Sequence, residues 1–293
     1  MPSSVASRPA PGLGASIGLV LLSIASVQLG AGFAKQLFTD VEPDGVVWLR
    51  LVTSAAVLLA WARPVLRGRS RADWLVVLRY GACLAVMNWA IYQSFSRIPI
   101  GVAVTIEFIG PLALAAAGFR RARHLGWVGL AALGVLLLGF ERTHLDPLGV
   151  AYAVLAGAAW AGYILSSAAT GRRWAGIDGL AVASGVAVLL LSPLLLTVEV
   201  GDLLDARVLA IGAAVGLLSS VVPYSAEIAA LRTLPAATFG VLMSLEPAAA
   251  ALAGLLLVGE DLAPVQWAAI GCVVLATVGA TRATRARVLP DVI

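Results

Sequence analysis

Two glutamates lie inside long apolar stretches of this sequence, and a proline follows each of them closely. Glu107 belongs to the run IEFIGP at 106–111, which ends in Pro111, and Glu246 belongs to the run SLEPAAAA, in which Pro247 comes next. An ionisable side chain is costly at membrane depth, and a proline there deprives a backbone carbonyl of its helical donor. Burial favours the neutral form of a carboxyl group, so such a group can exchange a proton, and when ionised it can hold an ammonium group. These residue types therefore predict a site for protons, for a small amine, or for both in alternation.

Composition places the chain in the membrane. Of its 293 residues, 60% are hydrophobic and only 12% are charged, a balance typical of multi-spanning membrane proteins. About 20 apolar residues in a helix cross the hydrocarbon core of a bilayer. Runs of this kind predict an all-α membrane protein with ten transmembrane helices, near 14–34, 45–62, 74–95, 100–119, 124–140, 148–169, 177–198, 208–230, 236–258 and 264–281.

Basic residues predict the orientation of these helices, because cytoplasmic loops retain lysine and arginine during insertion. With the N-terminus inside, fourteen arginines fall in inner segments, and both tails, 1–13 and 282–293, are expected in the cytoplasm. The net charge of +4 comes from these short inner clusters, so no nucleic-acid partner is implied. The outer loops hold four basic residues, namely Lys35, Arg97, Arg142 and Arg207.

Two further arginines and two cysteines fall within or beside the expected spans. Arg50 and Arg79 lie close enough to helix ends for their guanidinium groups to reach the interface, and we interpret both in that way. Cys83 and Cys272 are small apolar residues in this setting. No disulfide and no metal site is implied.

The two halves of the chain resemble each other. A shift of 136 residues places Pro111 on Pro247 and aligns long apolar segments around them. We therefore expect a first repeat at 14–140, a linker at 141–147 and a second repeat at 148–281. Each repeat has five spans, and because this number is odd the second repeat enters the membrane with the opposite orientation. The sequence thus predicts two inverted five-helix repeats.

In the aligned repeats the two glutamates are one helical turn apart, because Glu107 matches Met243 and Glu246 matches Gly110. This spacing predicts that they lie on adjacent faces of the fourth and ninth helices, near the middle of the membrane. The alternative is that each is neutral or hydrogen-bonded to a neighbouring helix and serves packing.

Other polar and aromatic residues inside the spans are candidates for a substrate-binding or proton-coupling site. Amides and phenols can line a cavity, although they can also join helices within the lipid. Asn88 and Tyr224 coincide under the same shift of 136 residues, which favours both as site residues. Tyr92 lies one turn beyond Asn88 and is favoured with them. The candidates besides the two glutamates are Asn88, Tyr92, Tyr224, Gln28, Trp160 and Tyr163.

Glu227 has two interpretations that the sequence leaves open. It is either a gate or proton relay, or one partner of an interfacial ion pair with Arg232. No catalytic constellation and no nucleotide-binding motif is found, and His124 and His144 fall in loops on opposite sides. The chain is therefore not expected to be an enzyme or to hold a cofactor.

At two long segments the sequence resembles a known family, the drug/metabolite transporter superfamily with tandem EamA domains. The segments are 88–113 and 223–266, and within the superfamily they are similar to those of threonine/homoserine exporters. The resemblance implies a ten-helix permease of the bacterial cytoplasmic membrane that exports small amino acids, driven by a proton gradient. Its expected partners are a small-molecule substrate and the lipid bilayer, with no obligate protein partner.

The expected mechanism is alternating access, in which the two halves rock about a central cavity and Glu107 or Glu246 is protonated from outside. Three alternatives remain. A multidrug pump would use the same acids to bind hydrophobic cations, and a metabolite uptake carrier would run in the opposite direction. A membrane scaffold or sensor, which transports nothing, would tolerate glutamine at both positions.

Overall fold

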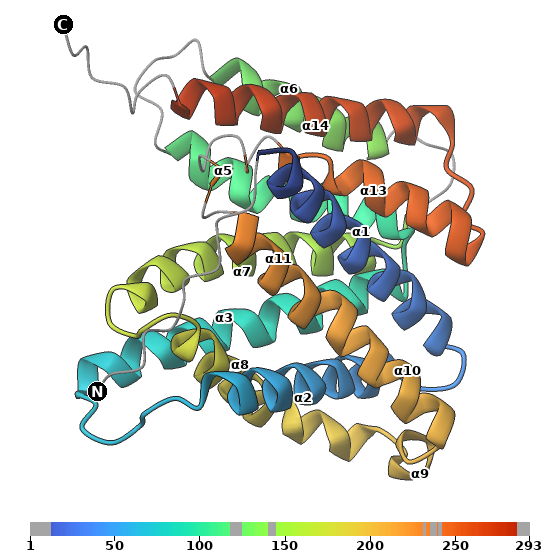
Figure 1. Cartoon of the computed structure of the whole chain (residues 1–293). Coiled ribbons are helices and arrows are strands. Elements are labelled where there is room, and N and C mark those ends of the chain that lie inside the picture. The colour runs from blue at the N-terminus through green and yellow to red at the C-terminus, as the bar shows by residue number, and fades with distance from the viewer. Residues whose placement is uncertain are drawn as a thin grey trace, which may run out of the picture.

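The computed structural model describes residues 13–117, 125–139, 145–230, 233–234, 239 and 242–285, and every regular element among them is helical (Figure 1). The first half contains α1 (Leu13–Leu37), α2 (Pro43–Ala62), α3 (Arg71–Phe95), α4 (Ile100–Glu107), α5 (Ile109–Ala117) and α6 (Leu125–Gly139). The second half contains α7 (Pro147–Gly171), α8 (Asp178–Leu191), η2 (Ser192–Thr197), α9 (Val200–Leu203), α10 (Ala206–Gly216), η3 (Leu217–Val221), α11 (Val222–Ala230), α13 (Glu246–Ala253), η4 (Gly254–Val258) and α14 (Pro264–Arg285).

Helix length and composition make this chain an all-helical membrane protein. Within the described part of the chain, six helices are long and apolar enough to cross a bilayer, and three apolar helices are shorter. The six are Leu13–Leu37, Pro43–Ala62, Arg71–Phe95, Pro147–Gly171, Asp178–Thr197 and Ala206–Glu227. The shorter ones are Ile100–Leu114, Glu246–Val258 and Pro264–Gly279.

Local sequence signals fix where several helices begin. Ser70 and Asp73 form a reciprocal capping box at the start of α3, and Pro43 occupies the first turn of α2, where a missing N–H costs nothing. At the opposite end of α3, Asp146 caps α7 by accepting a hydrogen bond from the Leu148 N–H at 2.8 Å.

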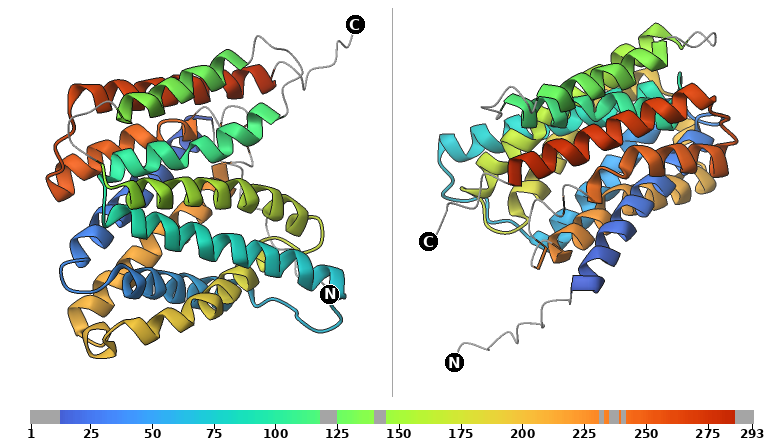
Figure 2. Two further views of the ribbon diagram at one scale, coloured as in Figure 1. Left: turned by 180° about the vertical axis from the view of Figure 1, so that it is seen from behind. Right: turned by 90° about the horizontal axis from the view of Figure 1, so that it is seen from above.

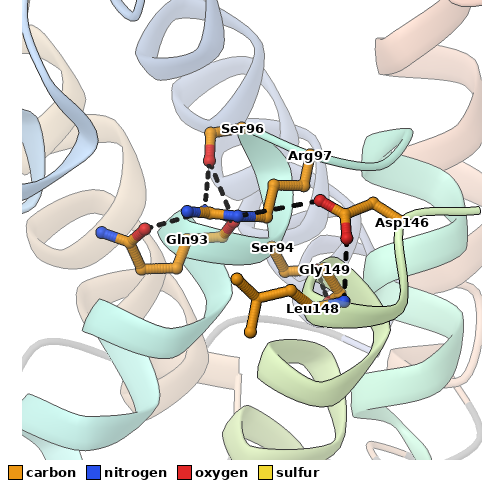
Figure 3. Close-up of polar contacts among 7 residues, drawn as sticks. All are labelled: Gln93, Ser94, Ser96, Arg97, Asp146, Leu148 and Gly149. Atoms are coloured by element: carbon orange, nitrogen blue, oxygen red, sulfur yellow. Dashed lines mark hydrogen bonds and ion pairs between the residues drawn. The ribbon is translucent and has the colours of Figure 1, made fainter.

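The end of α3 and the beginning of α7 are joined by polar contacts (Figure 3). Arg97 lies 3.9 Å from the second carboxylate oxygen of Asp146, and the Ser94 hydroxyl donates to the Gly149 carbonyl at 2.9 Å. The helix-capping aspartate therefore also positions α7 against α3.

Four of the expected helices are irregular beside a proline. In two of them a new helical segment begins next to the proline, η2 at Pro193 and α13 at Pro247. The span predicted at 100–119 is divided at Phe108 into α4 and α5, because Pro111 cannot donate a hydrogen bond to the carbonyl of Glu107. The span predicted at 208–230 contains the π-helical turn η3, which ends two residues before Pro223. Such turns leave backbone carbonyls free for other partners and are frequent at functional sites.

Helices of the first half of the chain pack against helices of the second half. α3 packs against α7, α1 against α11, α4 against α13, α2 against α8 and α6 against α14. Figures 1 and 2 show α6 and α14 side by side along one edge, with α2 and α8 at the opposite edge. The largest cluster of buried apolar residues extends through α2, α3 and α4 toward α7 and α13.

Candidate functional site

A cavity of about 170 Å³ lies among α1, α2, α3, α4, α7, η3, α11 and α13. It brings together residues that are far apart in the sequence and includes nearly every candidate from the sequence. The candidates on its wall are Gln28, Asn88, Glu107, Trp160, Tyr163, Tyr224, Glu227 and Glu246.

Three carboxyl groups line this cavity. Glu107 is the last residue of α4 and Glu246 the first of α13, and they are 9% and 8% exposed. Glu246 interacts electrostatically with both Glu227 and Glu107. Glu227 accepts a hydrogen bond of 2.5 Å from the Ser23 hydroxyl, which ties α11 to α1. Like charges repel strongly in a low-dielectric cavity, so this group of acids favours a bound proton or a bound cation.

Arg50 also lies on the cavity wall, so the interpretation of Arg50 as an interfacial residue is wrong. Its Nη2 donates to the Ser219 carbonyl at 3.2 Å, and its guanidinium carbon is 5.3 Å from the centre of the Tyr92 ring. The helical donor to that carbonyl would be the N–H of residue 223, which is Pro223 and has none. The proline break thus supplies Arg50 with a partner inside the bundle. Arg79, by contrast, is exposed on α3.

Tyr92 is not among the residues that line the cavity. It is 1% exposed, and its ring packs edge-on against Phe38 with centroids 6.0 Å apart. Because Arg50 lies over its face, Tyr92 positions the arginine from behind. Tyr92 was expected to contact the substrate directly. Its position instead indicates that it holds the Arg50 guanidinium in place.

Aromatic rings form part of the cavity wall. Trp160 contacts Phe108 edge to face with centroids 4.8 Å apart, and Tyr163 lies 5.1 Å from Tyr80. Asn88 donates to the Leu84 carbonyl of its own helix at 2.8 Å. Flat apolar surfaces beside a few polar groups are typical of sites for small organic molecules.

A separate polar cluster, which sequence reasoning missed, joins α1, α4 and the segment after η4. Lys35 lies 2.5 Å from Glu260 and donates to the Ile98 carbonyl at 2.9 Å, and the Ile100 N–H donates to the other Glu260 oxygen at 2.8 Å. Glu260 therefore satisfies the first turn of α4 while pairing with α1. The sequence showed these charges only as loop residues.

Some sequence-based expectations concern residues outside the described part of the chain. These are the loop positions of His124, His144 and Arg142, and Arg232 as the partner of Glu227. Among the residues that the structure describes, no group of three or more His, Cys, Asp or Glu side chains could hold a metal ion.

Comparisons with known proteins assign the chain to a family. The family model for EamA-like transporters matches residues 147–282. The chain is 40% identical to the threonine/homoserine exporter RhtA of Escherichia coli K12 over 97% of this chain and 96% of that protein. It is 40% identical to RhtA of Salmonella typhimurium LT2 over 91% of each chain. Its identity to the uncharacterized transporter YwfM of Bacillus subtilis is 27%, over 79% of this chain and 81% of that one.

A solved crystal structure shares the fold. It has a TM-score of 0.60 with this structure and covers 93% of this chain and 99% of its own, at 16% sequence identity. The all-helical fold, the cavity lined by acids and aromatic rings, and the similarity over nearly the full length lead to one assignment. The chain belongs to the EamA-like transporter family and is a multi-pass membrane transporter, not an enzyme.

Proposed function

We propose that this protein exports threonine, homoserine or a similar small amino acid in exchange for protons. The observation that carries the proposal is the cavity in which Glu107, Glu246 and Arg50 are held together. An amino acid is a zwitterion, and a site that contains both an arginine and carboxyl groups is complementary to it. The similarity to RhtA over nearly the whole chain supports this substrate class.

We also propose that the fold consists of ten spans in two inverted repeats, 14–140 and 148–281. The helix contacts support this division. A contact between two helices from different halves recurs between the equivalent helices when each helix is replaced by its counterpart in the other repeat. α3 packs on α7 as α11 packs on α1, and α3 packs on α8 as α10 packs on α2. Gly81 allows the close approach of α3 to α8, and Gly216 allows that of α10 to α2. The match of the family model to 147–282 coincides with the proposed second repeat.

The arginine distribution supports an orientation with both termini in the cytoplasm, in a bacterial inner membrane. In this orientation Lys35 and Glu260 lie toward the outside. A substrate would enter the cavity from the cytoplasm, with its ammonium group bound by an ionised carboxyl. Protonation of Glu107 or Glu246 from outside would release the ammonium outward, and release of that proton inside would complete the cycle.

The test is transport by the purified protein in liposomes. An imposed proton gradient is expected to drive accumulation of radiolabelled threonine and homoserine against their own gradients, and a protonophore is expected to abolish it. Drug-like cations are the second substrate class to include, because aromatic Trp160, Tyr163 and Tyr224 accompany the acids. Cation transport without amino-acid transport would replace the proposed substrate.

A separate prediction concerns the Lys35–Glu260 pair, which we propose closes the cavity toward the outside. The side chains are only 18% and 11% exposed, so removing one partner leaves a poorly solvated charge. The Lys35→Glu variant is expected to open this end at least about tenfold more often, a factor equivalent to about 1.4 kcal/mol. The double variant Lys35→Glu with Glu260→Lys is expected to restore part of the closure, because the ion pair returns while the hydrogen bonds to the Ile98 carbonyl and from the Ile100 N–H do not.

Opening can be measured by the labelling of a cysteine in place of Ala31, which lines the cavity. Cys83 and Cys272 are replaced by alanine, and a membrane-impermeant maleimide is added outside intact cells. Arg207→Glu is the control, because the Arg207–Asp40 pair is 71% and 36% exposed and such surface pairs contribute little. Equal labelling with and without Lys35→Glu would exclude this gate.

A further inference from the structure

Arg50 retains hydrogen-bonding capacity that no residue in the described part of the chain meets. Its Nε is buried without a partner, and so is the hydroxyl oxygen of Ser219, the residue whose carbonyl accepts from Arg50 Nη2. Two acceptors on the same cavity wall, Gln28 Oε1 and Glu246 Oε2, are also buried without partners among the described residues. Buried polar groups normally have partners, so a cluster of unmet groups in one cavity indicates a polar ligand.

The position of Arg50 is fixed although part of its fork is free. Its Nη2 is held by the Ser219 carbonyl at 3.2 Å, which Pro223 leaves without a helical donor. The Tyr92 ring lies under the guanidinium at 5.3 Å. A guanidinium held in this way presents its remaining N–H groups in a fixed plane, which is the geometry that binds a carboxylate with two hydrogen bonds.

The acids of the cavity do not occupy this fork. Arg50 interacts electrostatically with Glu107, yet the two form no direct ion pair, and the four ion pairs among the described residues involve other side chains. Both residues line the same cavity, so the guanidinium and the carboxyl group face one space without being paired to each other. A zwitterion placed there would meet a basic group at one end and an acidic group at the other.

We propose that Arg50 binds the α-carboxylate of the transported amino acid, with the Ser219 hydroxyl as a second donor, while Glu107 or Glu246 binds the ammonium group. This assignment rests on the proposed function as an amino-acid exporter. It makes Arg50 the residue that selects amino acids over amines and cationic drugs, which have no carboxylate to place at the fork.

The test compares ligands that differ only in the carboxylate. Isothermal titration calorimetry measures the binding of threonine, threoninamide and threoninol to the purified unmodified protein and to the purified Arg50→Gln variant. The unmodified protein is expected to bind threonine about 10- to 100-fold more tightly than threoninol, the range for a lost charge-assisted hydrogen bond. Arg50→Gln is expected to lose that preference, to bind threoninol as before, and to bind threoninamide at least as well as threonine.

Arg50→Lys keeps the charge without the fork and is expected to bind threonine with intermediate affinity. Arg79→Gln removes an exposed arginine from α3 and is expected to change nothing. If Arg50→Gln does not fold, the unmodified protein still tests the assignment. Equal affinities of the unmodified protein for threonine and threoninol would overturn it. A strong preference that falls in Arg50→Lys supports it.

Two results distinguish a failure of the Arg50 assignment from a failure of the proposed function. If Arg50→Gln binds threonine as the unmodified protein does, or weakens threonine and threoninol equally, the carboxylate assignment is wrong while amino-acid binding stands. If the unmodified protein binds neither threonine nor homoserine, the proposed function fails and the assignment fails with it.

Discussion

Replacing Glu107 or Glu246 by glutamine is expected to reduce gradient-driven threonine export by about 100-fold or more, which corresponds to about 2.7 kcal/mol. Glutamine has nearly the same size and retains hydrogen bonding, but it can neither carry a proton nor balance an ammonium group. Both carboxyls lie on the cavity wall and are almost fully buried. The loss therefore reports the charge and the proton rather than the shape of the side chain.

Two assays distinguish the roles of the two acids. Exchange of internal for external threonine requires substrate binding but no net proton movement, whereas accumulation against a gradient requires both. The acid that carries the proton is expected to retain exchange when changed to glutamine, and the acid that binds the ammonium group is expected to lose exchange as well.

Glu199→Gln is the matched control, because Glu199 is exposed and makes no capping hydrogen bond to α9. It is expected to transport normally. If Glu107→Gln and Glu246→Gln both keep wild-type dependence on the proton gradient, the two acids serve packing and the coupling site lies elsewhere.

The second large effect is expected at the contact between the α4–α5 break and α7. A Cβ added to Gly110 would lie 1.8 Å from the carbonyl oxygen of Gly157, and one added to Gly157 would lie 2.5 Å from the carbonyl of Glu107. These neighbours are backbone atoms, which cannot rotate away as a side chain can. Gly110→Ala therefore forces α5 and α7 apart and is expected to destabilise the protein by at least about 2 kcal/mol.

Thermal unfolding in detergent measures this effect, and Gly18→Ala provides the control. Gly18 lies in α1 with no atom near the position of an added Cβ, so alanine there is expected to be neutral or slightly stabilising. The same melting temperature for Gly110→Ala and the unmodified protein would mean that the close approach of the two backbones is absent in the folded protein. Because the contact lies directly beside Glu107, Gly110→Ala is also expected to impair transport.

The sequence by itself determined the class of the protein and predicted the chemistry of its site. Hydropathy is a local property, since about 20 apolar residues identify a membrane helix whatever surrounds it. Acids and prolines inside such runs are visible in the same way, so Glu107 and Glu246, with Pro111 and Pro247 beside them, could be found without coordinates. The family was also evident, because long segments around these residues resemble it.

The tertiary structure decided which of these residues face one another. Arg50 is near the end of a helix in the sequence, and its position on the cavity wall depends on a carbonyl 169 residues away. Tyr92 resembles the other cavity candidates in type and spacing, yet it lies behind Arg50 instead of on the wall. The pairing of Lys35 with Glu260 and the contact of Gly110 with Gly157 likewise join distant segments. The physical reason is that periodicity and hydropathy report the environment of a helix face, whereas a site is formed by contacts between helices, which arise only when the helices pack.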